Sequence, residues 1–128
     1  MELLTKISVE EYLEQEAKAE HKSEYHAGET KAMAGASRNH NVLVANIITI
    51  LNNCLKEKSC LVLPSDMLVK LPDCEKYVYP DLIIVCGEEK YEKHRGLDVL
   101  LNPTIVIEVL SESTANYDSN EKMECYFT

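Results

Sequence analysis

Two short runs of this chain, YVYPDLIIVC and NPTIVIEVLSEST, each have an acid set among apolar residues, Asp81 in the first and Glu108 in the second. Both runs predict β-strands, and a charged side chain in such a strand is costly to bury without compensation. Strand side chains alternate between faces, so Asp81 shares a side with Ile83 and Glu108 shares one with Val106. If the strands are neighbours with matched faces, the two carboxylates converge. Such a pair favours Mg²⁺ or Mn²⁺, whose usual chemistry at such a site is phosphodiester hydrolysis.

Each acid also has a structural interpretation, and both interpretations stay open. Asp81 could cap a turn at the margin of a sheet, with Pro80 marking the start of the strand. Glu108 could form an ion pair with Lys70 or Arg95, because ion-pair networks also hold buried carboxylates. The presence of two such acids in one short chain favours a functional site.

Length and composition limit the classes of protein that fit. The 128 residues are 45% hydrophobic, which predicts a single domain with a modest core. Acidic residues outnumber basic ones by 22 to 13, which gives a net charge of −9. This charge argues against a protein that binds nucleic acid through a broad basic surface. It does not argue against a nuclease, which needs only a local basic groove. The five cysteines are odd in number and include no C-x-x-C, so we expect neither disulfides nor a zinc cluster. Without a signal peptide or membrane span, a soluble cytoplasmic protein is expected.

Local signals in the first half predict two helices and a hairpin. Ser8 followed by Glu11 is a capping box that opens an amphipathic helix. The segment 24–34, with Gly28 at its middle, predicts a short hairpin. Ser37 or Asn39 can cap a second helix, expected from about His40 to Lys56 and well buried because its apolar stripe is wide.

The second half predicts a sheet. The expected elements are a strand over 60–71 broken at Pro64–Ser65, a central strand over 78–86 covered on both faces, a loop over 87–98, a strand over 104–110, and a helix that begins near Asp118. The simplest packing of this order is an α/β domain with helices on both sides of a central sheet.

Several motifs occur in an order that resembles a known family. They are SVEEYLEQE, EYHAGETKAMAGAS, RNHNVLVANI, PSDMLVKL, YPDLIIVCG, NPTIVIEVLSEST and YDSNEKMECY. The combination resembles the family described as putative restriction endonucleases, within the PD-(D/E)xK nuclease superfamily. The resemblance covers nearly the whole chain. It implies a restriction-endonuclease-like mixed β-sheet flanked by helices, and a Mg²⁺- or Mn²⁺-dependent endonuclease that acts on DNA.

The resemblance also implies roles for individual residues. Asp81 and Glu108 match the family's metal ligands. The lysine of the superfamily normally lies two residues after the glutamate, where this chain has Leu110, and Lys122 occupies the alternative place on the following helix. A cation there could orient the attacking water or stabilise negative charge. The competing interpretation of Lys122 is a solvated helix residue paired with Asp118 or Tyr126, one turn away.

Two further residues match the family pattern less specifically. Glu24 matches an acid before the hairpin that often contributes to the metal site, so it is a fourth candidate catalytic residue, although most glutamates are simply exposed. His40 could bind phosphate or complete the metal shell, or it could be a capping or packing residue.

Relatives of this family continue beyond the position of Lys122 into further strands. We therefore expect a homo-oligomer that covers the apolar sheet surface, and reduced activity for the isolated chain. The alternative function is a catalytically inactive nuclease fold that serves as an interaction or dimerisation module. The absence of suitable His/Cys spacing argues against a zinc-binding module.

Overall fold

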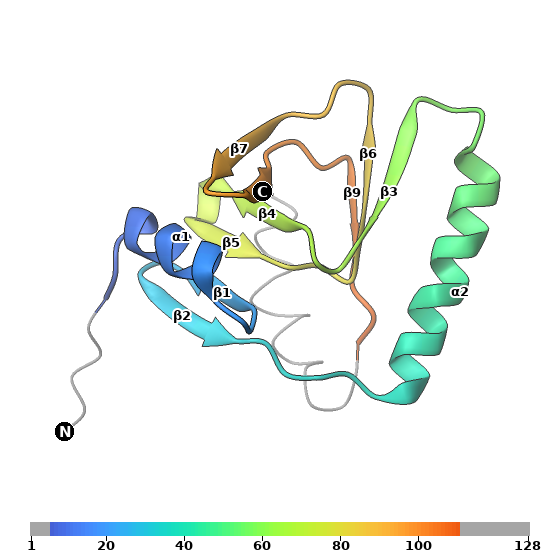
Figure 1. Cartoon of the computed structure of the whole chain (residues 1–128). Coiled ribbons are helices and arrows are strands. Elements are labelled where there is room, and N and C mark those ends of the chain that lie inside the picture. Colours follow the sequence, from blue (N-terminus) through green and yellow to red (C-terminus); the bar gives the residue numbers. More distant parts are fainter. Residues whose placement is uncertain (1–5, 111–128) are drawn as a thin grey trace.

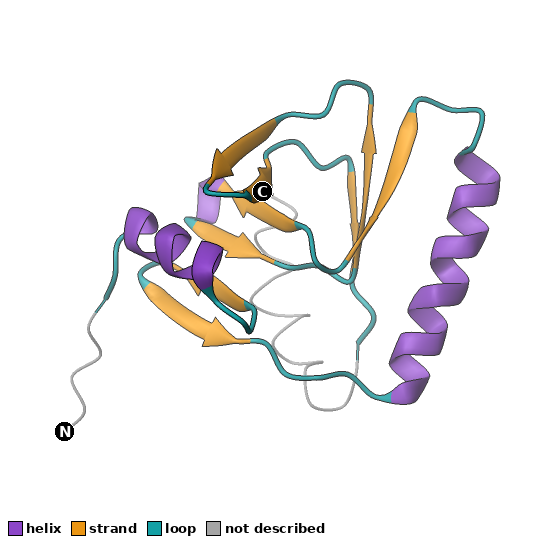
Figure 2. Ribbon diagram, viewed as in Figure 1, coloured by secondary structure: helices purple, strands orange, loops and turns teal. Residues whose placement is uncertain are grey.

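The computed structural model describes residues 6–110, which form two helices and two β-sheets (Figures 1 and 2). The first sheet has six strands in the order β2-β1-β5-β4-β8-β7, and the second has three strands in the order β3-β6-β9. The strands are β1 (Ser23–His26), β2 (Glu29–Ala32), β3 (Cys60–Pro64), β4 (Leu68–Leu71), β5 (Lys76–Val78), β6 (Leu82–Cys86), β7 (Tyr91–His94), β8 (Leu97–Leu100) and β9 (Ile105–Ile107), and a 3₁₀ turn spans Pro72–Cys74. This mixed α/β architecture confirms the expected fold class, with two sheets where one was expected.

The first helix, α1 (Val9–Lys18), begins at the expected capping box. The Ser8 hydroxyl oxygen accepts a hydrogen bond from the Glu11 backbone N–H at 3.1 Å, and the Glu11 carboxylate accepts one from the Ser8 N–H at 3.4 Å. These two bonds satisfy backbone donors that the first helical turn would otherwise leave free. The hairpin prediction is also confirmed, since β1 and β2 pair across a turn at Ala27–Gly28, where both residues have positive φ.

The second helix, α2 (Arg38–Leu55), is capped by Ser37 as expected, but the expectation that it is well buried is wrong. None of its residues is buried, and Val42, Leu43 and Ile50 are 40, 48 and 59% exposed. The reason is visible in Figure 1, where α2 stands beside the three-stranded sheet, contacts it along one side and has no element on its other side. Apolar pattern alone does not reveal how many neighbours a helix has.

The expected single strand over 78–86 is wrong, because the structure divides it between the two sheets. Its start belongs to β5 in the six-stranded sheet, and its remainder is β6 in the three-stranded sheet. The chain crosses between the sheets at Tyr79–Asp81, where Pro80 has no N–H to donate to a ladder. The predicted break at Pro64–Ser65 is confirmed, since it separates β3 from β4.

The loop expected over 87–98 is also wrong, because this charged segment forms most of an antiparallel hairpin, β7–β8. Its turn is Arg95–Gly96, where φ is positive at both residues. Charged side chains point outward from the sheet edge and obscure the alternation. The strand expected over 104–110 is confirmed in its central part by β9, and the helix expected from Asp118 lies outside the described residues.

Two apolar clusters hold the layers together. Between the sheets, a cluster joins Val69 and Val78 of the six-stranded sheet to Ile83 and Val85 of β6, all of them at most 1% exposed. Under α1, the second cluster is built around Tyr12, Tyr25 and Tyr77, whose ring centroids lie 5.1–6.0 Å apart. The three-stranded sheet is therefore fixed to the rest of the molecule through β6.

The structure contains a disulfide between Cys60 and Cys86, which contradicts the expectation of no disulfides. The antiparallel pairing of β3 with β6 places these two residues directly opposite one another. Cysteine count and spacing along the chain contain no information about that register. Cys54, on α2, is a free and exposed thiol. No helix within residues 6–110 has both the length and the apolar character that crossing a membrane requires.

We expect Cys60→Ser to lower the free energy of unfolding by about 3 kcal/mol, because the disulfide closes a loop across a sequence separation of 26 residues. Urea denaturation under non-reducing conditions measures the change. Cys54→Ser is the matched control and should change the free energy by less than about 0.5 kcal/mol. Equal stability of the two variants would contradict the disulfide.

The tyrosine cluster predicts a loss of stability at alkaline pH. Burial raises the pKa of Tyr12, Tyr25 and Tyr77 above the ordinary tyrosine value of about 10, so the unfolded chain ionises these phenols first. Their contribution should be fully present below about pH 10 and decline as the pH rises above it. Urea denaturation at pH 8, 10 and 11 measures this decline. Tyr77→Phe should show a smaller decline, and an identical decline in both proteins would contradict the assignment.

Candidate functional site

Asp81 and Glu108 lie at adjacent ends of two paired strands. β6 and β9 are antiparallel, with Leu82 opposite Ile107 and Ile83 opposite Val106. Continued by one residue, this register places Asp81 opposite Glu108. Directly opposite residues of an antiparallel pair project from the same face, with Cβ atoms about 4.5–5.5 Å apart. Asp81 directly precedes β6 and Glu108 directly follows β9, so the two paired strands bring the two predicted acids to the same end of the three-stranded sheet.

The carboxylate of Asp81 is held on both oxygens. Its Oδ2 accepts a hydrogen bond from the Val109 backbone N–H at 2.6 Å, which ties it to the residue that follows Glu108. Its Oδ1 lies 3.2 Å from Nε2 of His40. The Asp81 side chain is 19% exposed, so solvent still reaches it. Asp81 therefore precedes a strand and fixes local backbone, as its structural interpretation expects, and its carboxylate remains accessible to solvent.

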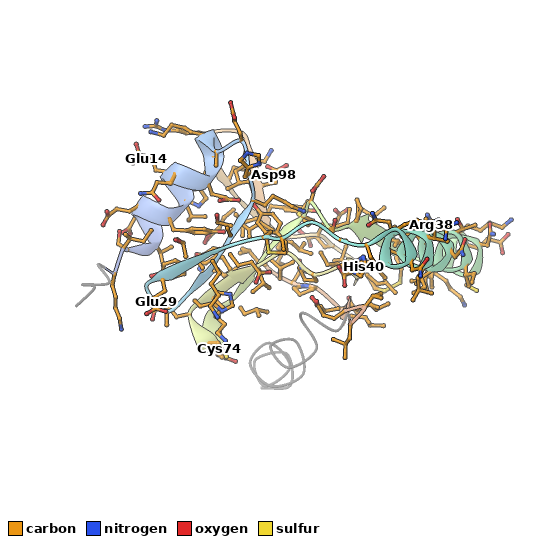
Figure 3. The ribbon with its side chains drawn as sticks, turned by 90° about the horizontal axis from the view of Figure 1, so that it is seen from below. Glu14, Glu29, Arg38, His40, Cys74 and Asp98 are labelled. Carbon is orange, nitrogen blue, oxygen red and sulfur yellow. A yellow bond between two sulfur atoms is a disulfide. The ribbon has the colours of Figure 1, made fainter. Side chains whose placement is uncertain are left out.

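His40 approaches this carboxylate from the first turn of α2, where Figure 3 labels it close to Arg38. The helix start is fixed by Ser37, whose hydroxyl oxygen accepts a hydrogen bond from the His40 N–H at 3.1 Å. The His40 side chain is 16% exposed, and its Nδ1 is buried without a hydrogen-bond partner in the described part of the chain. His40 therefore contacts the candidate site directly, which sequence reasoning left undecided.

Glu24 is 2% exposed and lies on β1. Its Oε2 accepts a hydrogen bond from the Tyr79 backbone N–H at 2.8 Å, and its Oε1 lies 3.2 Å from Nε2 of His26. Tyr79 stands two residues before Asp81 in the segment that crosses between the sheets. Glu24 is thus connected to the candidate site through the backbone that leads to Asp81.

The Tyr79 side chain is held as firmly as its backbone. Its hydroxyl donates a hydrogen bond to the Glu16 carboxylate of α1, which also accepts one from the Ser23 N–H at 3.1 Å. Burial, with Glu16 as the next cause, raises the pKa of the Tyr79 phenol. The Lys22 ammonium lies 5.2 Å from the centre of the tyrosine ring. Sequence reasoning missed this arrangement, although the spacing of Glu24 and His26 does predict a shared strand face.

The cations considered as partners for Glu108 have other carboxylates nearby. Lys70 Nζ lies 3.1 Å from Glu92 Oε1, and this bond raises the pKa of Lys70. Arg95 Nη1 lies 3.8 Å from Glu14 Oε1. Glu108 itself is half-buried and has interactions of its own.

The remaining site predictions concern the residues near Lys122. Leu110, in the usual position of the superfamily lysine, is 50% exposed. Lys122 lies outside the described residues, so its prediction stays open. Over residues 6–110, no group of three or more His, Cys, Asp or Glu side chains is arranged to hold a metal ion. The described part of the site therefore offers a pair of acids at matching positions, one of them contacted by His40.

Comparison with known proteins identifies the family. A family model described as "Putative restriction endonuclease" (Uma2) matches residues 9–128. Two proteins of Synechocystis sp. (strain ATCC 27184 / PCC 6803 / Kazusa), the uncharacterized proteins sll1609 and slr1290, are 38% identical over 122 residues and 33% identical over 121 residues. These matches cover 95% and 94% of this chain, but only 68% and 62% of the relatives.

The fold also matches a solved structure. The crystal structure of "a putative nuclease belonging to DUF820" from Anabaena variabilis ATCC 29413 superimposes with a TM-score of 0.66 at 16% identity. The match covers 84% of this chain and 61% of that protein, so the chain spans less than two thirds of its solved structural relative. At this identity the likeness concerns the fold. The family model and the identity with sll1609 show that this chain belongs to the Uma2 family of putative restriction endonucleases.

Proposed function

We propose that this chain provides the metal-binding site of a DNA endonuclease that hydrolyses phosphodiester bonds, with Asp81 and Glu108 as ligands of Mg²⁺ or Mn²⁺. The observation that supports this most is the β6–β9 pairing, because its register, continued by one residue beyond Leu82 and Ile107, would place the two acids opposite one another. Two carboxylates at that spacing repel one another unless a cation or a proton lies between them. The family match makes DNA the expected substrate.

The residues present fit a hard divalent cation. Mg²⁺ is usually bound by one or two carboxylates, with water and substrate phosphate oxygens completing its shell, so a third acid is not required. Asp81 accepts a hydrogen bond from the Val109 N–H and lies 3.2 Å from His40 Nε2, and these contacts leave further lone pairs on its oxygens. Carboxylate oxygens suit Mg²⁺ and Mn²⁺, whereas a soft metal would favour thiolates.

The roles of the residues follow from their positions. A bound ion would lower the pKa of a water molecule and stabilise charge on the phosphate. Asp81, fixed on both oxygens, presents a preoriented carboxylate, and Glu108 supplies the second one from the neighbouring strand. By resemblance, Lys122 orients the attacking water or stabilises the charge that develops during the reaction.

Glu24 supports the site through the backbone in this proposal. Its carboxylate holds the Tyr79 N–H, and Glu16 holds the Tyr79 hydroxyl, so the segment that ends at Asp81 is fixed at two points. A carboxylate that is 2% exposed and already bonded to the backbone has limited access to a solvated ion. Glu24 therefore acts on the site by positioning Asp81.

The second candidate function is a catalytically inactive module that binds a partner or a second copy of this chain. The observation that favours it is the outer surface of α2, which exposes Val42, Leu43 and Ile50. No Asp, Glu, Lys or Arg occurs from residue 39 to residue 55, although 27% of the chain is charged. Exposed, uncharged surfaces of this kind are typical of interaction sites. Metal binding and DNA cleavage distinguish the two functions.

We expect Asp81→Asn and Glu108→Gln each to weaken Mn²⁺ binding by about tenfold or more, because each removes a charged ligand. Calorimetric titration measures the affinity.

Asp98→Asn and Glu88→Gln are the matched controls, because both acids are exposed and lie outside the β6–β9 pair. They should bind Mn²⁺ as the parent does. Plasmid cleavage by this chain should require Mg²⁺ and stop in Asp81→Asn. If both site variants bind Mn²⁺ with the affinity of the parent, the metal site lies elsewhere; metal binding without any cleavage would favour the interaction module.

The positioning role of Glu24 makes a separate prediction. Glu24→Leu should lower the free energy of unfolding by about 1–3 kcal/mol, because it leaves the buried Tyr79 N–H without an acceptor. Glu24→Gln, which retains a carbonyl oxygen, should lose less and should keep most of the Mn²⁺ affinity. Urea denaturation and calorimetry provide the two measurements. Loss of Mn²⁺ binding in a fully stable Glu24→Gln protein would instead make Glu24 a ligand.

A further inference from the structure

We propose that His40 is a positioning residue of the metal site, which holds the Asp81 carboxylate in place by donating a hydrogen bond and does not itself bind the metal. This inference rests on the proposed function, because it concerns the residue that orients one of the two proposed ligands. It adds α2 to the elements that build the site.

The geometry gives His40 a defined partner. Its Nε2 lies 3.2 Å from Asp81 Oδ1, while the other oxygen of the same carboxylate accepts the Val109 N–H at 2.6 Å. The two contacts come from different elements, the first turn of α2 and the segment after β9. Asp81 lies just before β6, so its side chain needs such contacts to keep a single orientation.

The environment of the other ring nitrogen identifies the donor. His40 Nδ1 is buried and has no hydrogen-bond partner in the described part of the chain. A proton on Nδ1 alone would leave a buried donor unpaired and would also direct the Nε2 lone pair at a carboxylate oxygen. A proton on Nε2 avoids the repulsion, because the N–H then points to Asp81, and it leaves Nδ1 as an unpaired acceptor instead of an unpaired donor. The structure therefore favours Nε2 as the donor.

A positioning role follows from this assignment. With its proton on Nε2, the imidazole has no free lone pair directed towards Asp81, and Nδ1 is buried away from solvent. Imidazole ligands favour later transition metals, whereas carboxylates and water suit Mg²⁺ and Mn²⁺. If His40 only orients Asp81, its replacement should weaken binding of Mg²⁺ and Mn²⁺ to a similar extent. If His40 were a ligand, Mn²⁺ binding would suffer more than Mg²⁺ binding.

Three replacements of His40 separate the hydrogen bond from the shape of the side chain. His40→Gln places an amide N–H at about the distance from the backbone where Nε2 lies, so it can still donate to Asp81. His40→Met has a similar reach and no donor. His40→Asn is polar but one methylene shorter, and it provides a second non-bonding variant if the methionine variant does not fold.

Calorimetric titrations with Mn²⁺ and with Mg²⁺ measure the effect. We expect His40→Met and His40→Asn to weaken both affinities by about tenfold, and His40→Gln to restore most of the loss for both ions. Val44→Ala, a half-buried change on the same helix, controls for a general loss of stability and should leave both affinities unchanged.

The outcomes distinguish this inference from the function on which it rests. If the parent does not bind Mn²⁺, the proposed function fails and the inference with it. If the parent binds Mn²⁺ and His40→Met and His40→Asn bind it equally well, only the inference fails. A loss of Mn²⁺ binding in all three variants with Mg²⁺ binding intact would make His40 a ligand. Equal losses in His40→Gln and His40→Met would assign the effect to ring packing and overturn the role of the hydrogen bond.

Discussion

The antiparallel pairing of β6 with β9 is the interaction on which the candidate site depends. It brings Asp81, just before β6, and Glu108, just after β9, to the same end of the three-stranded sheet, although they are far apart in the sequence. Packing stabilises the position of β6 in this pair, because Ile83 and Val85 of β6 pack against the six-stranded sheet. A shift of the β6–β9 register by one residue would turn one of the two acids to the other face of the sheet. The apolar residues that surround the acids therefore determine the geometry of the pair.

The crossing between the two sheets is the second constraint, because it determines where β6 begins. Pro80 cannot continue a ladder, and Tyr79 is fixed through its backbone by Glu24 and through its hydroxyl by Glu16. Buried carboxylates are costly unless their hydrogen bonds are complete, and each of these two glutamates accepts hydrogen bonds from donors around it. These hydrogen bonds from α1 and β1 thus fix the position of the segment that leads to Asp81. Glu24 can therefore support the site although it lies far from Asp81 in the sequence.

Sequence reasoning succeeded where the deciding interactions are local. The helix caps and turns lie within a few residues of one another, so both helices and the first hairpin could be located from the sequence. It failed where the deciding partner is distant: the division of the 78–86 run and the Cys60–Cys86 bond both depend on strand pairing. For the site, the two acids could be selected because each interrupts an apolar run. The contacts of His40 and Glu24 could not be predicted, since they depend on how separate elements pack.

The arrangement around Asp81 also bears on the relation between metal binding and folding. In structural metal sites the ligands come together only with the ion, and binding energy is then folding energy. Here the Val109 N–H and the His40 side chain both contact the Asp81 carboxylate, and the surrounding strands are fixed by apolar packing. Protein groups therefore supply the contacts that orient this proposed ligand. A cation at this site would mainly neutralise the charge of the two acids and stabilise charge on a bound substrate. A catalytic metal site requires both effects.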